Sequence, residues 1–171
     1  MDEGNPSFEH KSTEETVISQ EKNEAGEQLE PQKKVWTVDD LYGKMMARII
    51  KLKFQKINDP IQSEGFIDGE SVIKAFTDQI KSLPNIIIMD GQLNIEGSEY
   101  KSGVTLMKKL IEIMDDAKIS VRPLFIANSD VEELNNEMEK LGAIITKAKK
   151  PDLEPLYDFV LQKLTRKQNE Q

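Results

Sequence analysis

Residues 85–91 read NIIIMDG, in which four consecutive apolar side chains lead directly into Asp90 and a glycine. A short apolar run bounded by polar residues predicts a strand that is covered on both faces, as in a parallel sheet. A carboxylate is costly to bury unless it lies at the mouth of a crevice or beside cations. The edge of the sheet at which this strand ends is therefore a candidate functional site.

From Lys33 onward, short apolar segments alternate with longer amphipathic ones. Besides NIIIMDG, the predicted strands are KVWTVDD, EGFIDG, RPLFIAN and AIITKA, at residues 34–40, 64–69, 122–128 and 143–148. The predicted helices cover residues 41–56, 70–83, 103–117, 130–142 and 152–164. Five strands that alternate with five helices predict an α/β fold with a doubly wound, five-stranded parallel sheet.

The first predicted helix has one apolar face, formed by Leu41, Met45, Ile49 and Leu52. The methionines of the folded part, including Met45, Met46 and Met107, are expected to be packing residues. This helix also contains five basic residues and no acid, a pattern that suits a partner helix or a membrane surface. The simpler interpretation, which we prefer, is that its lysines solubilise a helix packed on the core.

Charge is distributed unevenly along the chain. Residues 1–32 hold nine acids and two lysines, whereas the other 139 residues carry 21 basic and 22 acidic side chains. The first segment is predicted to be a disordered acidic tail, because it has few apolar residues and no period. We therefore expect a folded domain at residues 33–167 and a disordered end at 168–171. Since the folded part is nearly neutral, nucleic acid is not an expected partner.

Several classes of protein are excluded by what the sequence lacks. It has no cysteine, which excludes disulfides and thiolate sites, and its one histidine, His10, lies in the tail, which excludes a Ser-His-Asp triad inside the domain. Neither a dinucleotide-binding GxGxxG nor a P-loop motif occurs. No signal peptide and no apolar run long enough to span a membrane is present, so we expect a cytoplasmic protein without membrane insertion, with a nuclear location left open.

Polar residues follow four of the predicted strands. They are Asp39 and Asp40, Asp90, Asn128 and Ser129, and Lys150. In an open α/β sheet these ends share one edge, where ligands bind near the reversal of strand order. Three carboxylates brought together repel each other unless a cation neutralises them, and hard oxygen ligands suit Mg²⁺. With a lysine and a hydroxyl nearby, this edge would accommodate a phosphoryl group.

Five segments together resemble the receiver domain of response regulators, over about residues 34–164. They are VDD at 38–40, DGESVIKAF at 68–76, IIIMDGQLN at 86–94, RPLFIANS at 122–129 and KKPDLEPL at 149–156. The resemblance implies a flavodoxin-like (βα)5 fold that takes part in two-component or phosphorelay signalling. The expected partners are a histidine kinase or a histidine phosphotransfer protein and a downstream protein target.

The resemblance also implies a role for each site residue. Asp90 would be the phosphorylated nucleophile, and Asp39 and Asp40 would hold Mg²⁺ together with Asp90 and the backbone carbonyl of Gln92. Lys150 would pair with the acceptor carboxylate and then with the phosphoryl group. Ser129 is the candidate for the hydroxyl that contacts the phosphoryl oxygen. The receiver pattern places Asn128, rather than a hydroxyl, at the switch position.

The sequence departs from the receiver pattern at several other places. The segment between Asp90 and the helix at Gly103 is longer than usual, with Asn94 where a proline is common. The fifth strand lacks the usual aromatic residue. One extra residue before Lys150 makes Lys149 and Lys147 rival candidates for the site lysine.

Structural interpretations of the same residues remain open. Asp40 could be the N-cap of the helix that begins at Leu41, and Asp90 could begin a turn with Gly91. Ser129 or Asp130 could cap the following helix. Lys150 could be one solvated lysine of a cluster.

The function predicted from these residues is that of a stand-alone, Mg²⁺-dependent phosphoacceptor. It is a signalling domain that catalyses its own phosphorylation and not a conventional enzyme. Because no output domain follows, its output is expected to be binding to another protein. The alternative is a pseudo-receiver, which has the same fold and serves as an interaction module without phosphorylation. A hydrolase that forms an aspartyl-phosphate ranks third. Such an enzyme usually has a second acid two residues after the first, and this sequence has Gln92 there.

Overall fold

The computed structural model describes residues 32–146 and 152–165, and the structural statements that follow concern these residues. Strands and helices alternate strictly along them. The strands are β1 (Lys34–Val38), β2 (Gln62–Phe66), β3 (Ile86–Met89), β4 (Leu124–Ala127) and β5 (Ile144–Ile145). The helices are α1 (Gly43–Lys56), α2 (Gly69–Asp78), α3 (Gly103–Asp116), α4 (Glu132–Lys140) and α5 (Glu154–Thr165).

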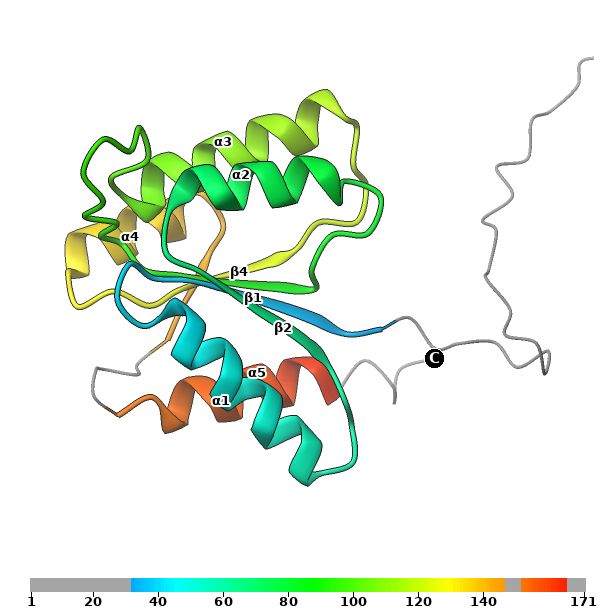
Figure 1. Cartoon of the computed structure of the whole chain (residues 1–171). Helices are drawn as coiled ribbons and strands as arrows, with labels where there is room; N and C mark the ends of the chain where they lie inside the picture. The colour runs from blue at the N-terminus through cyan, green and yellow to red at the C-terminus, as the bar shows by residue number, and fades with distance from the viewer. Residues whose placement is uncertain (1–31, 147–151, 166–171) are drawn as a thin grey trace, which may run out of the picture. The chain divides into compact units, whose positions relative to one another are not determined.

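The five strands form one parallel sheet in the order β2-β1-β3-β4-β5. In Figure 1 the strands run toward the left, so their carboxyl ends share that edge. Val38, the last residue of β1, pairs with Phe66 on one side and with Met89 on the other. The sequence order reverses direction at β1, which places the ends of β1 and β3 side by side. The predicted doubly wound α/β fold is confirmed.

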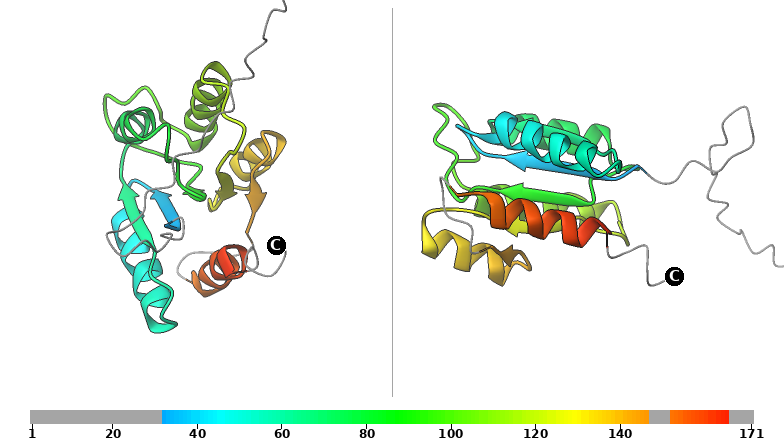
Figure 2. Two further views of the ribbon diagram at one scale, coloured as in Figure 1. Left: turned by 90° about the vertical axis from the view of Figure 1, so that its right-hand side faces the viewer. Right: turned by 90° about the horizontal axis from the view of Figure 1, so that it is seen from below.

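Helices cover both faces of the sheet (Figure 2). Helices α1 and α5 pack on one face, while α2, α3 and α4 pack on the other. Along β3 the side chains alternate between the two layers: Ile86 and Ile88 face α1 and α5, and Ile87 and Met89 face α2 to α4. All four are buried, which explains why a parallel strand with period-two geometry reads as a continuous apolar run.

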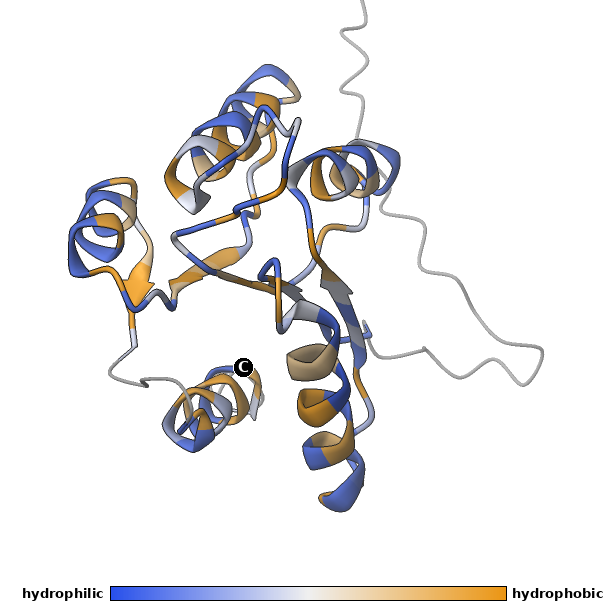
Figure 3. Cartoon of the chain, turned by 60° about the vertical axis from the view of Figure 1, so that its left-hand side comes forward, coloured by the Kyte–Doolittle hydropathy of each residue, from blue (hydrophilic) through white to orange (hydrophobic). Residues whose placement is uncertain are grey.

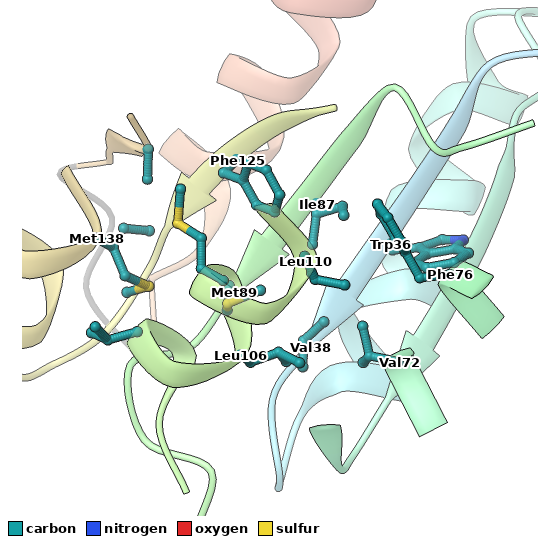
Figure 4. Close-up of a cluster of buried hydrophobic side chains, with 14 of the residues drawn as sticks. Trp36, Val38, Val72, Phe76, Ile87, Met89, Leu106, Leu110, Phe125 and Met138 are labelled. Carbon is teal, nitrogen blue, oxygen red and sulfur yellow. The ribbon is translucent and has the colours of Figure 1, made fainter. Parts of the chain in front are cut away.

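The core on the α2 to α4 side contains Trp36 together with Phe76 and Phe125 (Figure 4). Trp36 of β1 lies 4.9 Å from Phe66, measured between ring centroids, and 6.1 Å from Phe76 of α2. Leu106 and Leu110 of α3 are fully buried in the same cluster. Full burial of such side chains contributes roughly 1.5–3 kcal/mol each, so this layer is a major source of stability for the elements that carry the site.

Two predictions about helix α1, its start and its buried face, differ from the structure. The helix begins at Gly43, two residues after the predicted start, and its buried apolar face is formed by Met46, Ile50 and Phe54. Of the face predicted from the sequence, Ile49 packs against the core and is partly buried, whereas the other three residues, Leu41, Met45 and Leu52, are 75%, 47% and 48% exposed. We call these three residues the outer ridge. Met46 and Met107 are packing residues as expected, whereas Met45 is not.

Strand β2 begins at Gln62, two residues before the predicted strand. The hydrophobic pattern missed this start because the first residues of the strand are polar. It is an edge strand, and in Figure 3 it is mostly hydrophilic beside the apolar central strands. Gly65 of β2 lies against the backbone at Gly43 and Lys44, so close that a Cβ atom there would overlap it. The absence of a side chain therefore lets the start of α1 approach the edge of the sheet.

Other boundaries differ by a few residues. Helix α2 ends at Asp78, five residues before the predicted end, and α4 begins at Glu132 rather than at Asp130. In the described part of the chain, no helix combines the length and the apolar character that crossing a membrane requires. The expected acidic tail lies outside the described residues except for Gln32, and so does the expected C-terminal end at 168–171.

Candidate metal centre at the carboxyl edge of the sheet

Backbone hydrogen bonds continue beyond the ends of three central strands and fix the residues that follow. The Asp39 N–H donates to the Phe66 carbonyl at 3.1 Å, and the Asp90 N–H donates to the Val38 carbonyl at 2.8 Å. The Asn128 N–H donates to the Met89 carbonyl at 3.0 Å. Asp39, Asp90 and Asn128 are therefore held in register, one residue past β1, β3 and β4.

Three acids meet at this edge. Carboxylate oxygens of Asp39, Asp40 and Asp90, one from each residue, lie within 4.8 Å of one another. Asp39 is fully buried and Asp90 is 7% exposed, whereas Asp40 is half-buried. Such a group is unfavourable without a compensating positive charge, because like charges at this distance repel each other in a poorly hydrated site.

This donor set fits Mg²⁺. The cluster offers hard carboxylate oxygens from two adjacent strands, and the partly exposed Asp40 leaves room for water on the solvent side. Magnesium commonly takes one or two carboxylates and keeps several waters. Asp39, Asp40 and Asp90 are therefore the residues that could hold the ion.

Asp39 also orders the loop that leads into α1. Its Oδ1 accepts hydrogen bonds from the Leu41 N–H at 2.9 Å and the Tyr42 N–H at 2.7 Å. The helix begins at Gly43, and its N-cap residue, Tyr42, makes no side-chain cap. The interpretation of Asp40 as an N-cap at Leu41 is therefore wrong, since Asp39 accepts the amide hydrogens of this loop.

Asp40 instead contacts the loop between β3 and α3. Its Oδ2 accepts a hydrogen bond from the Asn94 N–H at 2.9 Å. Gln92, the expected carbonyl ligand, lies at the start of this loop, and its N–H lies 3.4 Å from Asp90 Oδ1. The long segment noticed in the sequence is thus joined to the acid cluster at both Asp40 and Asp90.

Asn128 and Ser129 lie beside the cluster, at the end of β4. Asn128 is buried, and its Oδ1 accepts a hydrogen bond from Thr146 Oγ1 at 3.2 Å. Ser129 lies against Gly91, where an added Cβ would come within 2.6 Å of Ser129 Oγ. The Ser129 side chain is therefore close to Gly91, the residue that follows Asp90.

The Ser129 hydroxyl has a local contact as well. It accepts the Val131 N–H at 3.2 Å, so it orders the turn before α4. Neither Ser129 nor Asp130 is the N-cap residue, because α4 is preceded by Val131 and has no side-chain cap. The buried Asn135 holds the same turn: its Oδ1 accepts the Ser129 N–H at 2.9 Å, and its Nδ2 donates to the Ser129 carbonyl at 2.7 Å.

Sequence reasoning did not identify Asn135 or Thr146. Both are polar residues in otherwise amphipathic segments, and only their burial or their partners distinguish them from surface residues. The predicted lysine, Lys150, and its rivals Lys147 and Lys149 lie outside the described residues, between β5 and α5.

Comparison with known proteins supports the fold. No protein-family model matches the chain. No curated protein matches it either. Among solved structures, the receiver domain of the histidine kinase CKI1 from Arabidopsis thaliana, complexed with Mg²⁺ and BeF3⁻, superposes with a TM-score of 0.53 at 19% identity, covering 76% of this chain and 88% of that domain.

Two bacterial receiver domains are similarly close in structure. The CheY-like receiver from Methylobacillus flagellatus gives a TM-score of 0.51 at 18% identity and covers 75% of this chain and 98% of its own. The receiver of the Francisella response regulator 1452 gives 0.50 at 23% identity, covering 80% and 99%. The chain therefore has the fold of a response-regulator receiver domain, and the predicted resemblance is confirmed at the level of the fold.

Proposed function

We propose that the protein is a response-regulator receiver, with a receiver unit at residues 33–167, that accepts a phosphoryl group on Asp90. The observation that carries this proposal is the convergence of Asp39, Asp40 and Asp90 at the carboxyl edge of a receiver-fold sheet. Asp90 follows the central strand β3, and its backbone is fixed by the hydrogen bond to Val38. The donor would be a phosphohistidine on a histidine kinase or a histidine phosphotransfer protein.

In the proposed reaction a carboxylate oxygen of Asp90 attacks the phosphorus of the phosphohistidine. A P–O bond forms as the P–N bond breaks, and the imidazole leaves with the electron pair. A magnesium ion held by Asp39, Asp40 and Asp90, with the Gln92 carbonyl, would neutralise charge on the phosphoryl oxygens. Fixed backbones at Asp39 and Asp90 keep the carboxylates in place, so little reorganisation is needed when the phosphoryl group arrives.

Other residues support the product state in this proposal. Lys150, with Lys149 and Lys147 as rivals, would pair with the phosphoryl group as the receiver resemblance implies. The Ser129 hydroxyl lies next to Gly91, the residue that follows the acceptor, and would contact the phosphoryl oxygen as the receiver resemblance implies. Its release from the Val131 N–H would change the turn that leads into α4 and so alter a surface for a downstream protein.

The alternative is a pseudo-receiver that binds a partner without phosphorylation. The buried amide of Asn128, bonded to Thr146, favours this second function, because the switch position then has no hydroxyl to follow the phosphoryl group. The three acids favour the phosphoacceptor.

Intact mass measurement separates the two functions. The protein is incubated with acetyl phosphate, with and without Mg²⁺, beside Asp90→Asn and the exposed-acid control Asp130→Asn. We expect the wild type and Asp130→Asn to gain one phosphoryl group that requires Mg²⁺, and Asp90→Asn to gain none. A wild type that binds Mg²⁺ in calorimetry but gains no mass would support the pseudo-receiver.

A further inference from the structure

The loop between β3 and α3, residues 91–102, is closed at its base. The Gly103 N–H donates to the Gly91 carbonyl at 2.9 Å, and the Leu93 N–H donates to the Lys101 carbonyl at 3.0 Å. Gln92 and Ser102 form an antiparallel bridge, and Leu93 is fully buried in the core. The segment from Asn94 to Tyr100 therefore projects from a fixed base, immediately beyond the acceptor Asp90. Figure 1 shows it at the edge of the sheet where the helices begin.

The far side of this loop is held by one carboxylate of α2. Both oxygens of Glu70 lie within hydrogen-bond distance of Ser98 Oγ, at 2.9 and 2.8 Å, and Glu70 Oε1 also accepts the Glu99 N–H at 2.8 Å. Ser98 is buried, and its Oγ in turn accepts the Tyr100 N–H at 3.0 Å. Charge-assisted bonds of this kind are about twice as strong as neutral ones.

Close packing reinforces this attachment. The Tyr100 side chain lies so close to Gly69, the first residue of α2, that an added Cβ there would overlap it. Asp68 caps the same helix, accepting the Ser71 N–H at 2.7 Å, so the start of α2 is a rigid support. The loop is therefore bound to α2 by Glu70 and by the Tyr100 ring.

The near side of the same loop is bound to the acid cluster, through the Asn94 N–H and Asp40 Oδ2. Asp40 is the most exposed member of the cluster and follows β1 in a loop, so it needs an external contact to keep its orientation. Asn94 and Ser98 are only four residues apart, which makes the loop a short link between Glu70 and Asp40.

We propose that Glu70 is a positioning residue for Asp40, which acts through the β3–α3 loop. By holding Ser98 and Glu99, Glu70 keeps the Asn94 N–H directed at Asp40 and so keeps that carboxylate oriented toward Asp39 and Asp90. The contact to the loop is independent of the proposed function, whereas its consequence for Mg²⁺ and phosphoryl transfer rests on that function.

Amide hydrogen exchange tests the link in the metal-free protein. In Glu70→Ala we expect the Asn94 N–H to exchange at least about fivefold faster, which corresponds to a coupling of about 1 kcal/mol. Glu70→Gln, which keeps one acceptor oxygen, should recover part of the protection. The matched control is Glu96→Ala, which removes an exposed acid of the same loop and should leave Asn94 unchanged. The Ile87 N–H, in the central strand, reports whether the fold is intact.

Magnesium titration of the same variants measures the consequence for the site. Loss of a group that orients a metal ligand typically weakens metal binding by about 10-fold to 100-fold. Because Glu70 acts through the loop, we expect about threefold to tenfold weaker Mg²⁺ binding in Glu70→Ala and no change in Glu96→Ala. Unchanged Asn94 exchange in Glu70→Ala would overturn the proposal. A wild type that binds no Mg²⁺ would instead contradict the proposed function. The exchange of the Asn94 N–H would then be the measurement that tests whether Glu70 positions Asp40 through the loop.

Discussion

Glu70 is an exposed residue of α2 whose carboxylate accepts hydrogen bonds from the Ser98 hydroxyl and the Glu99 N–H. Burial raises the pKa of Glu70, but the hydrogen bonds from Ser98 and Glu99 together outweigh this effect and hold the pKa below its usual value of 4.5. Since the folded-state pKa is the lower one, the charged carboxylate stabilises the folded protein. This contribution is present above the unfolded-state pKa and is lost as the pH falls through the folded-state pKa.

We therefore expect the advantage of wild type over Glu70→Gln to shrink in acid. The measurement is the free energy of unfolding by urea for both proteins at about pH 7 and about pH 3, since carboxylates titrate between these values. Other carboxylates affect both proteins alike, so the difference between them isolates Glu70. A difference that is constant with pH would show that Ser98 and Glu99 do not depend on the charge of Glu70.

Residues at the strand ends could be predicted from the sequence, and their hydrogen-bond partners could not. The position of Asp39, Asp40 and Asp90 after predicted parallel strands sufficed to bring them to one edge. Two hydrogen bonds, from Thr146 to Asn128 and from the Ser129 N–H to Asn135, depend on how β5 and α4 pack beside β4. Local sequence patterns do not contain this information about packing. For the same reason the sequence did not show that Asp39, rather than Asp40, accepts the amide hydrogens of the loop before α1.

At the scale of the element, α1 shows that an apolar stripe in the sequence does not by itself identify the buried face of a helix. Two apolar stripes run along it: Met46, Ile50 and Phe54 on the buried side, and Met45 and Leu52 of the outer ridge on the other. Hydrophobic periodicity identifies a helix but cannot choose between two stripes. In the structure, the close approach at Gly43 and Gly65 holds the start of the helix against β2, and the Met46 stripe is the one that is buried.

Two adjacent methionines of α1 provide a matched test of this orientation. We expect Met46→Ala, at a fully buried position, to lower the free energy of unfolding by about 2–5 kcal/mol. Met45→Ala removes the same atoms from the outer ridge and should change it by no more than about 0.5 kcal/mol. Chemical denaturation of both variants gives the comparison. Equal losses would mean that the outer ridge is covered in the folded protein.

At the scale of the whole molecule, the strand order creates the site. Because β1 lies between β2 and β3, the helices that follow β1 and β3, which are α1 and α3, lie on opposite faces of the sheet, and the edge between the ends of these two strands stays accessible. Alternation of strands and helices was enough to predict the architecture. The position of the long β3–α3 loop was not predictable, because its anchors come from elsewhere in the chain: Glu70 from α2 and Asp40 from the loop after β1.

The same architecture places Leu41, one end of the outer ridge, next to the site, because Leu41 directly follows Asp39 and Asp40 in the chain. Exposed basic residues Lys44 and Arg48 lie on α1 beside the ridge. In the proposed function, an apolar strip with a basic border near Asp90 would suit an acidic amphipathic partner. In the proposed function that partner is the phosphohistidine donor.

Charge reversal on α1 tests this docking surface. We expect Lys44→Glu with Arg48→Glu to slow phosphoryl transfer from a phosphorylated histidine phosphotransfer protein by about tenfold or more, because repulsion replaces steering in the encounter. Phosphorylation by acetyl phosphate, which needs no docking surface, should keep its rate. The control with the same charge change reverses Lys74 of α2 and Lys108 of α3, both exposed. If the two pairs slow protein-donor transfer equally, the effect comes from net charge, and the donor docks elsewhere on the molecule.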